Sequence, residues 1–198
     1  MDDTFTLLPL HMDPGSKAIS APQSSQPSLH TELRALNELH TAFKGLETPV
    51  PPPPLPVNPK RSAQITKLRE TGNTHYKKGA YGEAIQMYTL GIKMALSRPM
   101  WEPAGLTREE ASGLYANRAQ AYMAMQNWPE GAIDAEASVE CKRVGNPKAW
   151  WRRGRCLLEM GRYEECQEWV KRGLEMEGNE QDLVGLMKEV EEKLARKN

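Results

Sequence analysis

The chain has 198 residues, 39% hydrophobic and 26% charged, so it has room for one helical domain of ordinary core size and an extension. Lys and Arg together number 26, as do Asp and Glu, and the zero net charge argues against a general nucleic-acid or anionic-membrane binder. Three cysteines, an odd number without metal-type spacing, predict free thiols in a reducing compartment.

Residues 1–47 form a predicted N-terminal extension. Residues 1–27 are rich in Pro, Ser and Gly, and we expect a short apolar strand followed by a loop. The apolar run from Phe5 to Leu10 is short and is interrupted by Pro9, which predicts neither a signal peptide nor a membrane span. We therefore expect a cytosolic chain with no direct membrane insertion, held at a membrane only through a partner.

A single amphipathic helix is predicted over about residues 28–46 of the extension. It begins with Ser28 as N-cap, and its apolar positions fall on one face. These positions are Leu29, Leu33, Leu36, Leu39, Phe43 and Leu46. Such a face must pack on something, either the convex side of the following domain or another subunit. In the second case the predicted partner-subunit contact comprises Leu29, Leu33, Leu36 and Phe43.

The segment TPVPPPPLPVNP, residues 48–59, is predicted to be a proline-rich linker. It is either a stiff spacer or a ligand for SH3-like domains, and the spacer is the default interpretation. Asn58 and Pro59 supply an N-cap and an N1 proline for the first helix of a domain predicted over residues 60–198.

Helix pairs recur three times in that domain. Tyr81, Trp128 and Tyr163 mark the start of each second helix, with spacings of 47 and 35 residues. A period of about 34 residues is typical of tetratricopeptide repeats, so the spacing indicates one insertion before the second repeat. The repeats are predicted at about residues 65–98, 112–145 and 147–180, with a capping helix at about 182–196. The predicted fold is an all-α solenoid whose first helices line a concave groove.

The insertion SRPMWEPAGLTREE, residues 97–110, is too rich in proline to prolong the preceding helix far. Thr107 and Glu110 form a predicted capping box that starts the second helix pair. Asn146 and Pro147 repeat the N-cap and N1 device before the third pair.

Five polar side chains lie on one side of the predicted groove. They come from the first helix of each pair: Arg69 and Asn73, then Asn117, then Lys148 and Arg152. Residues four apart share a helix face, so the stacked repeats bring these donors together. Two guanidinium forks, one compact ammonium and two amides, with no acid in the same slots, suit a ligand that carries two carboxylates.

The motifs LRETGN, YANRA and KAWWRRG resemble those of the dicarboxylate-clamp tetratricopeptide domains, over residues 65–198. The resemblance implies a non-enzymatic adaptor that holds the C-terminal tail, ending in Glu-Glu-Val-Asp, of cytosolic heat-shock chaperones. That family places a basic residue and an Asn on the first helix, an Asn on the third, and a Lys and an Arg on the fifth. The five residues above fill these slots, with Arg69 where Lys is usual.

Three further residues are predicted to line the peptide groove. Gln120 stands where the family usually has a small residue that lines the pocket for the last apolar side chain of the tail. Tyr76 is the candidate for the opposite wall. Trp151 either contacts upstream residues of the tail or is a partly exposed packing aromatic.

Over its whole length the chain resembles the fungal cytosolic subunits of the post-translational translocation complex of the endoplasmic reticulum. The features that carry this resemblance are the proline-interrupted N-terminal extension, the three clamp repeats, the insertion SRPMWEPAGLTREE and the lack of a predicted membrane span. This resemblance implies that a membrane-anchored subunit of the complex holds the chain at the cytosolic face, with residues 1–47 as the contact. The clamp would then dock chaperones there for protein import. The alternative is a soluble cytosolic co-chaperone of the same clamp family without a membrane tether.

Other functional classes fit the sequence less well. The five polar residues could be only the solvated faces of three helices, but that alternative does not explain why they occupy matching positions in three repeats. The run WWRR at residues 150–153 would suit stacking on nucleic acid, but Trp150 occupies a packing slot. The four histidines have no metal spacing or nucleophile partner, and Cys156 and Cys166 take slots of small buried residues. We therefore expect no enzyme activity, no metal and no cofactor.

Overall fold

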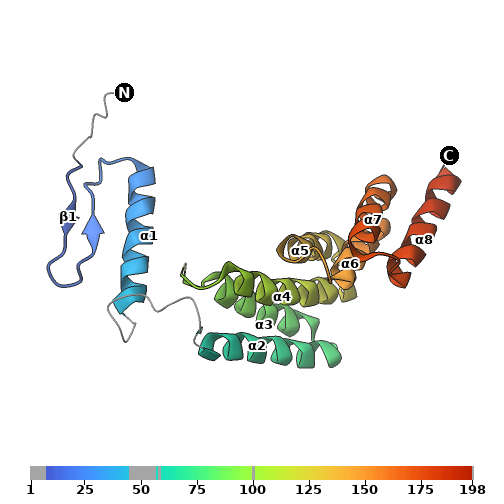
Figure 1. Ribbon diagram of the computed structural model, residues 1–198, viewed down its shortest axis with the longest axis horizontal. Helices are drawn as coiled ribbons and strands as arrows, with labels where there is room; N and C mark the ends of the chain where they lie inside the picture. Colours follow the sequence, from blue (N-terminus) through green and yellow to red (C-terminus); the bar gives the residue numbers. More distant parts are fainter. Residues whose placement is uncertain (1–7, 45–56, 58, 100, 198) are drawn as a thin grey trace. The chain divides into compact units, whose positions relative to one another are not determined.

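The chain divides into two compact units, Met1–Pro56 and Val57–Asn198. A computed structural model describes residues 8–44, 57, 59–99 and 101–197. The first unit holds strand β1 (His11–Met12), strand β2 (Ile19–Ser20) and helix α1 (Pro27–Lys44), which are labelled in Figure 1 except for β2. The predicted strand in the first ten residues lies mostly outside the described residues, as does the predicted linker at 48–59.

Helix α1 packs on the hairpin of its own unit, a partner that neither sequence interpretation included. The two strands are antiparallel, with His11 opposite Ser20. The side chain of Asn37, on α1, accepts a hydrogen bond from the backbone N–H of Ile19 and donates one to its carbonyl oxygen, each at 2.8 Å. The side-chain amide of Asn37 thus makes the two hydrogen bonds to Ile19 that a neighbouring strand would otherwise make. These bonds tie the helix to the edge of the hairpin.

The apolar stripe of α1 is used unevenly. Leu33 is only 7% exposed and lines a hollow together with Ile19 of β2, so it serves the unit's own packing and is not available for a partner. Leu36 is 47% exposed, while Leu29 and Phe43 are half-buried. Leu46 lies outside the described residues. Of the four predicted partner contacts, Leu36 is therefore the most accessible.

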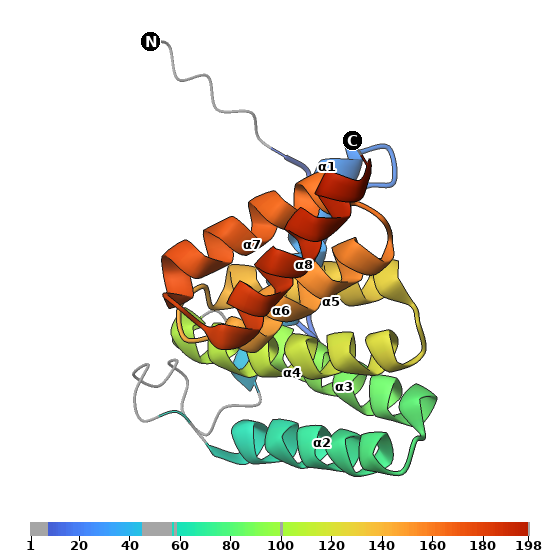
Figure 2. The same ribbon diagram turned by 90° about the vertical axis from the view of Figure 1, so that its right-hand side faces the viewer.

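The second unit is a stack of antiparallel helix pairs, and Figure 2 shows their successive layers. The helices are α2 (Pro59–Lys77), α3 (Tyr81–Leu96), α4 (Ala104–Ala124), α5 (Trp128–Cys141), α6 (Pro147–Glu159), α7 (Tyr163–Glu177) and α8 (Gln181–Lys197). Helix α8 closes the last pair with Leu183, Leu186 and Val190, which are almost fully buried. The predicted all-α solenoid of three helix pairs and a capping helix is confirmed.

Close packing within the pairs depends on glycine at the contact points. A Cβ at Gly72 would lie 2.5 Å from the ring of Tyr88, and one at Gly154 would lie 2.7 Å from Leu186 and 2.9 Å from Val170. Any larger residue would therefore push the two helices apart. Because Tyr88 is only 1% exposed, its ring fills the space that Gly72 leaves.

The turns inside the pairs share one backbone conformation. Gly79, Gln126 and Gly161 each stand two residues before the aromatic residue that begins a second helix, and their φ angles are 77°, 60° and 72°. A left-handed residue at this place ends the first helix and reverses the chain. In the first and third pairs a glycine adopts this left-handed conformation without strain, whereas in the second pair Gln126, which has a Cβ, adopts it.

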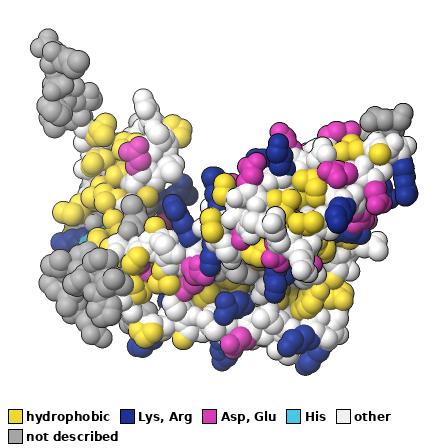
Figure 3. Space-filling model, turned by 45° about the vertical axis from the view of Figure 1, so that its right-hand side comes forward, with side chains coloured by type: hydrophobic (Ala, Val, Ile, Leu, Met, Phe, Trp, Pro, Cys, Tyr) yellow, Lys and Arg dark blue, Asp and Glu magenta, His cyan; other side chains and the backbone are white. Residues whose placement is uncertain are grey.

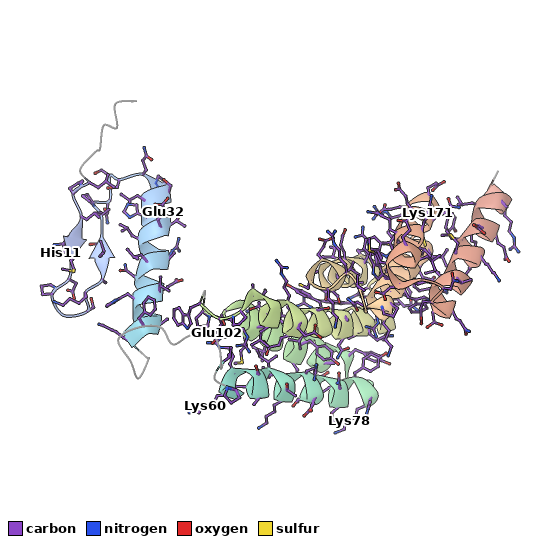
Figure 4. All side chains as sticks on the ribbon, viewed as in Figure 1. His11, Glu32, Lys60, Lys78, Glu102 and Lys171 are labelled. Carbon is purple, nitrogen blue, oxygen red and sulfur yellow. The ribbon has the colours of Figure 1, made fainter. Side chains whose placement is uncertain are left out.

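The insertion is anchored by a buried arginine. The guanidinium of Arg98 donates to both oxygens of Glu110 at 2.8 and 2.7 Å, to Ser62 of α2 at 2.7 Å, and also pairs with Glu102. Figure 4 labels Glu102 in the segment before α4. This cluster joins α2, the insertion and α4, and at 1% side-chain exposure the charge of Arg98 needs both carboxylates.

Two predicted caps, those of α1 and α4, are wrong. Helix α1 begins at Pro27, so Ser28 lies inside the helix instead of preceding it. Helix α4 begins at Ala104, so Thr107 lies inside the helix and Glu110 binds Arg98 instead of forming a capping box. Asn146 is the N-cap of α6 and Pro147 begins the helix, as predicted, but the side chain of Asn146 makes no capping bond there. Its amide donates instead to the carbonyl oxygens of Ser138 and Lys142, which ties the turn to α5. At α4 and α6 a tertiary partner thus outcompetes the local capping bond.

The Gly72 contact yields a stability prediction. Replacing Gly72→Ala should lower the free energy of unfolding by about 1–3 kcal/mol, because overpacking against Tyr88 outweighs the helix propensity of Ala. Gly185→Ala, in α8, is the matched control, since a Cβ there meets no atom within 4 Å; it should stabilise by about 0.5–1 kcal/mol. Urea unfolding followed by circular dichroism measures both. Equal effects of the two substitutions would contradict this account of the pairing.

Candidate carboxylate site

The first helices of the three pairs carry all five predicted clamp residues. Helix α2 contacts α4, and α4 contacts α6; Figure 1 labels all three helices in the second unit. Arg69 and Asn73 lie on α2, Asn117 lies on α4, and Lys148 and Arg152 lie on α6. The fold thus places residues that are up to 83 positions apart in the sequence on adjacent helices.

The two predicted amides contact each other directly. The side-chain N–H of Asn117 donates to Oδ1 of Asn73 at 3.0 Å, across 44 residues of sequence. The hydroxyl of Tyr88 donates to the same oxygen at 2.8 Å. Both lone pairs of the Asn73 oxygen are then used, so the amide N–H groups of Asn73 are the part that a ligand can bind.

Arg152 is held by two neutral oxygen acceptors on α4. Its Nε–H donates to Oε1 of Gln120 and its Nη1 donates to the carbonyl oxygen of Ala116, both at 2.8 Å. The side chain forms no ion pair with any residue that the structure describes. Burial lowers the pKa of Arg152 below its ordinary value, and only the nearby phenols of Tyr76 and Tyr88 oppose that shift.

Other half-buried arginines of the second unit are neutralised by their own chain. Arg98, Arg118, Arg153 and Arg155 each form an ion pair with at least one carboxylate. Arg61 forms none, but it donates to carbonyl oxygens at the C-terminal end of α3, where the helix dipole is negative. Arg152 therefore stands out as a desolvated cation that still lacks a counter-charge.

Arg69 and Lys148 supply positive charge at the edges of the site. Both side chains are exposed, and neither has an ion-pair partner among residues 8–44, 59–99 and 101–197. Arg69 reaches from α2 toward α4, since a Cβ at Gly113 would lie 3.8 Å from its Nη1. The site as a whole combines a half-buried cation, an ordered amide pair and two solvated cations, which suits an anion that approaches from solvent.

The three predicted wall residues fall in different environments. Gln120 lies beside Arg152 and binds it, so its oxygen faces the clamp. Tyr76 is half-buried with its ring 5.3 Å from that of Tyr81, and it is close enough to Arg152 to influence its pKa. Trp151 packs on the core cluster that contains Met123 and Cys156, as the packing alternative for this residue predicts.

Sequence analysis did not assign a role to Tyr88. Its position in the repeat predicts a core aromatic, and its ring is indeed buried. The only available signal was the choice of Tyr instead of Phe at such a position, since a buried hydroxyl needs a partner. Burial raises the pKa of Tyr88 to about 12, so the phenol stays protonated and can donate to Asn73 at neutral pH.

The nucleic-acid interpretation of WWRR finds no support in the geometry. Trp150 is 5% exposed, and its indole N–H donates to the carbonyl oxygen of Arg143. Arg153 pairs with Glu136 and lies over the ring of Trp169. Positive and negative side chains are interspersed on the face of the second unit seen in Figure 3. Trp150 and Arg153 therefore serve packing, and no basic stripe is seen on the face that Figure 3 shows.

Comparison with known proteins identifies the repeat. A family model described as tetratricopeptide repeat matches residues 147–180, which cover α6 and α7. The pairs α2–α3 and α4–α5 have the same helix order, the same turn and the same aromatic slot. The second unit is a tetratricopeptide-repeat domain. The five predicted clamp residues stand at the positions where the sequence resembles the dicarboxylate-clamp domains of this family.

The whole chain also resembles a subunit of a translocation complex. It is 40% identical over 126 residues to the ER protein translocation subcomplex subunit sec67 of Schizosaccharomyces pombe. The matched segment covers 64% of this chain and 65% of sec67, which is just under two thirds of that protein. A chain in the Sec complex from S. cerevisiae is similar over 96% of this chain and 99% of its own length, with a TM-score of 0.75 and 25% identity. That likeness includes both units.

A third relative was solved with a ligand. The first tetratricopeptide-repeat domain of Spaghetti (RPAP3), bound to the HSP90 peptide SRMEEVD, matches 68% of this chain and 95% of its own length. The TM-score is 0.57 and the identity is 28%.

In the described parts of the present chain, no helix is both long enough and apolar enough to cross a membrane, and no group of three or more His, Cys, Asp or Glu is placed to hold a metal.

Proposed function

We propose that the tetratricopeptide-repeat domain binds the acidic C-terminal tail of cytosolic heat-shock chaperones, of the Glu-Glu-Val-Asp type. The observation that carries this proposal is Arg152, a half-buried guanidinium whose acceptors within the described part of the chain are both neutral. A carboxylate from a ligand would provide the missing counter-charge. The structure of the RPAP3 domain with the peptide SRMEEVD supports this class of ligand.

The residues of the site match the groups of such a tail. The last residue of the tail carries two carboxylates, one on its side chain and one at the chain terminus. The guanidinium of Arg152 and the ammonium of Lys148 are suited to these charges, and the amides of Asn73 and Asn117 can donate to carboxylate or peptide oxygens. Arg69 is placed on α2 to meet the acidic residues that precede them.

We further propose that the chain works as a non-enzymatic adaptor at the cytosolic face of the endoplasmic reticulum. Its likeness to sec67 and to a chain of the Sec complex supports this location. The adaptor would bring chaperones that carry unfolded precursors to the translocation complex for post-translational import. A membrane-anchored subunit of the complex would hold the chain there.

The first unit is the proposed contact with that membrane-anchored subunit. It exposes several large apolar side chains although it is small: Leu8, Leu10, Met12 and Leu36 are 47–56% exposed. Exposed apolar side chains on a small unit indicate a surface that is covered in a complex. We therefore propose the exposed part of α1 and the hairpin as the contact, instead of the whole apolar stripe of α1.

The clamp is tested by peptide binding. The double variant Lys148→Ala/Arg152→Ala should bind a labelled peptide ending in Glu-Glu-Val-Asp at least about thirtyfold more weakly than wild type, because losing one clamp charge costs about 2 kcal/mol. We expect a dissociation constant on the order of micromolar for wild type. Fluorescence anisotropy of the full chain measures both. The control Lys171→Ala/Lys188→Ala, which removes two exposed charges from α7 and α8, should bind as wild type. Equal binding by the clamp variant would refute the assignment.

Ionic strength offers a second test. Arg69 and Lys148 are exposed, so salt should screen their attraction to the tail. We expect the affinity to fall on the order of tenfold between about 0.05 and 0.5 M NaCl. A peptide with both Glu residues replaced by Gln should show a shallower dependence. An affinity that does not change over this range would count against a charged clamp.

The tether is tested by cell fractionation. In fungal cells that express the tagged full chain, Met12→Asp/Leu36→Asp should move most of the protein from the membrane pellet to the supernatant, since each apolar side chain contributes about 1.5–3 kcal/mol when buried at an interface. Ile133→Asp, at a 67% exposed position of the repeat domain, is the control and should stay with the membranes. If the wild-type chain is itself in the supernatant, the free co-chaperone alternative holds.

A further inference from the structure

We infer that Gln120 and Tyr88 are positioning residues of the carboxylate site. Gln120 fixes the guanidinium of Arg152, and Tyr88 fixes the amide of Asn73, before any ligand arrives. The inference rests on the proposed function, because the ligand in question is the carboxylate-bearing tail. It concerns which N–H groups of the site face that ligand.

The contacts of Arg152 use two of its five N–H groups. An arginine has five N–H donors in a rigid plane: one on Nε and two on each Nη. The Nε–H is taken by Gln120 and one Nη1–H by the carbonyl oxygen of Ala116. The three remaining N–H groups are on Nη1 and Nη2. A carboxylate therefore has to bind through the Nη atoms, because Gln120 already uses the Nε–H.

Both anchors of Arg152 come from a single turn of α4. Ala116 and Gln120 are four residues apart and so lie on the same face of that helix. Two hydrogen bonds to a planar group fix its plane as well as its place, which a single bond would not do. A small residue at position 120 would leave only the bond to Ala116 and would allow the guanidinium to rotate.

Tyr88 acts in the same way on Asn73. The hydroxyl of Tyr88 and the amide of Asn117 both donate to Oδ1 of Asn73, so that oxygen is directed away from the ligand. Without the hydroxyl of Tyr88, the oxygen of Asn73 would lose one of its two donors. The orientation in which the Asn73 amide is flipped would then compete with the present one. A flipped Asn73 would present an oxygen to the incoming carboxylate and repel it.

The first experiment requires no ligand. In nitrogen-15 NMR spectra of the full chain, the Nε–H of Arg152 should give a resolved, slowly exchanging signal in wild type, because Gln120 protects it. Gln120→Met removes the acceptor at similar volume and should abolish that signal. Gln86→Met, at an exposed position of α3, is the control and should preserve it. A signal that persists in Gln120→Met would overturn the role of Gln120.

The second experiment is a pair of double-mutant cycles with the free-acid peptide. Gln120→Met and Tyr88→Phe should each weaken binding about tenfold, the size of one hydrogen bond to a charged or ordered group. The effect of Gln120→Met should vanish in an Arg152→Ala background, and that of Tyr88→Phe in an Asn73→Ala background. A merely structural role would give the same loss in both backgrounds, and so would overturn the inference.

The two experiments separate this inference from the proposed function. If wild type does not bind the free-acid peptide, the proposed function fails, whereas the Nε–H signal still decides whether Gln120 holds Arg152. If wild type binds and the cycles show no coupling, the proposed function stands and the positioning roles are wrong. Unchanged thermal unfolding of the four single variants shows that the losses do not come from misfolding.

Discussion

The site depends on one arrangement: the guanidinium of Arg152 is held half-buried by the neutral oxygens of Gln120 and Ala116, and it forms no ion pair with a carboxylate among the residues that the structure describes. Taking a charge out of water without a partner is costly, so such an arrangement is retained where a ligand completes it. The surrounding amides and solvated cations are consistent with that, because they offer donors and positive charge only. The proposed chaperone tail supplies the missing negative charge.

The fold places that arginine. Gly72 and Gly154 let the helices of the first and third pairs approach closely, and the left-handed residues at 79, 126 and 161 reverse the chain in the same way each time. As a result α2, α4 and α6 lie side by side, and Arg152 can reach the neighbouring turn of α4. The same packing buries Tyr88 against Gly72, which brings its hydroxyl to Asn73. Core packing and site geometry are therefore parts of one structure.

Much of this was predictable from the sequence because it is periodic. The aromatic slots, the helix pairs and the positions of the five donors follow from a repeat that can be aligned with itself. Contacts between distant residues were not predictable in this way. The bond from Tyr88 to Asn73, the use of Gln120 as an anchor and the docking of Asn37 on Ile19 depend on tertiary packing. The failed capping box at Thr107 and the missing capping bond of Asn146 show the same limit, since tertiary partners for Glu110 and Asn146 replaced the local bonds.

The most direct test of the central claim compares two peptides that differ at a single group. A peptide ending in Glu-Glu-Val-Asp is offered to the wild-type chain with a free or an amidated C-terminus, and both dissociation constants are measured. A site built around a desolvated arginine and directed amide donors should prefer the free acid by at least about thirtyfold, because amidation removes one full charge. Equal affinity for the two peptides would contradict the account, since it would mean that the terminal carboxylate is not what Arg152 and its neighbours bind.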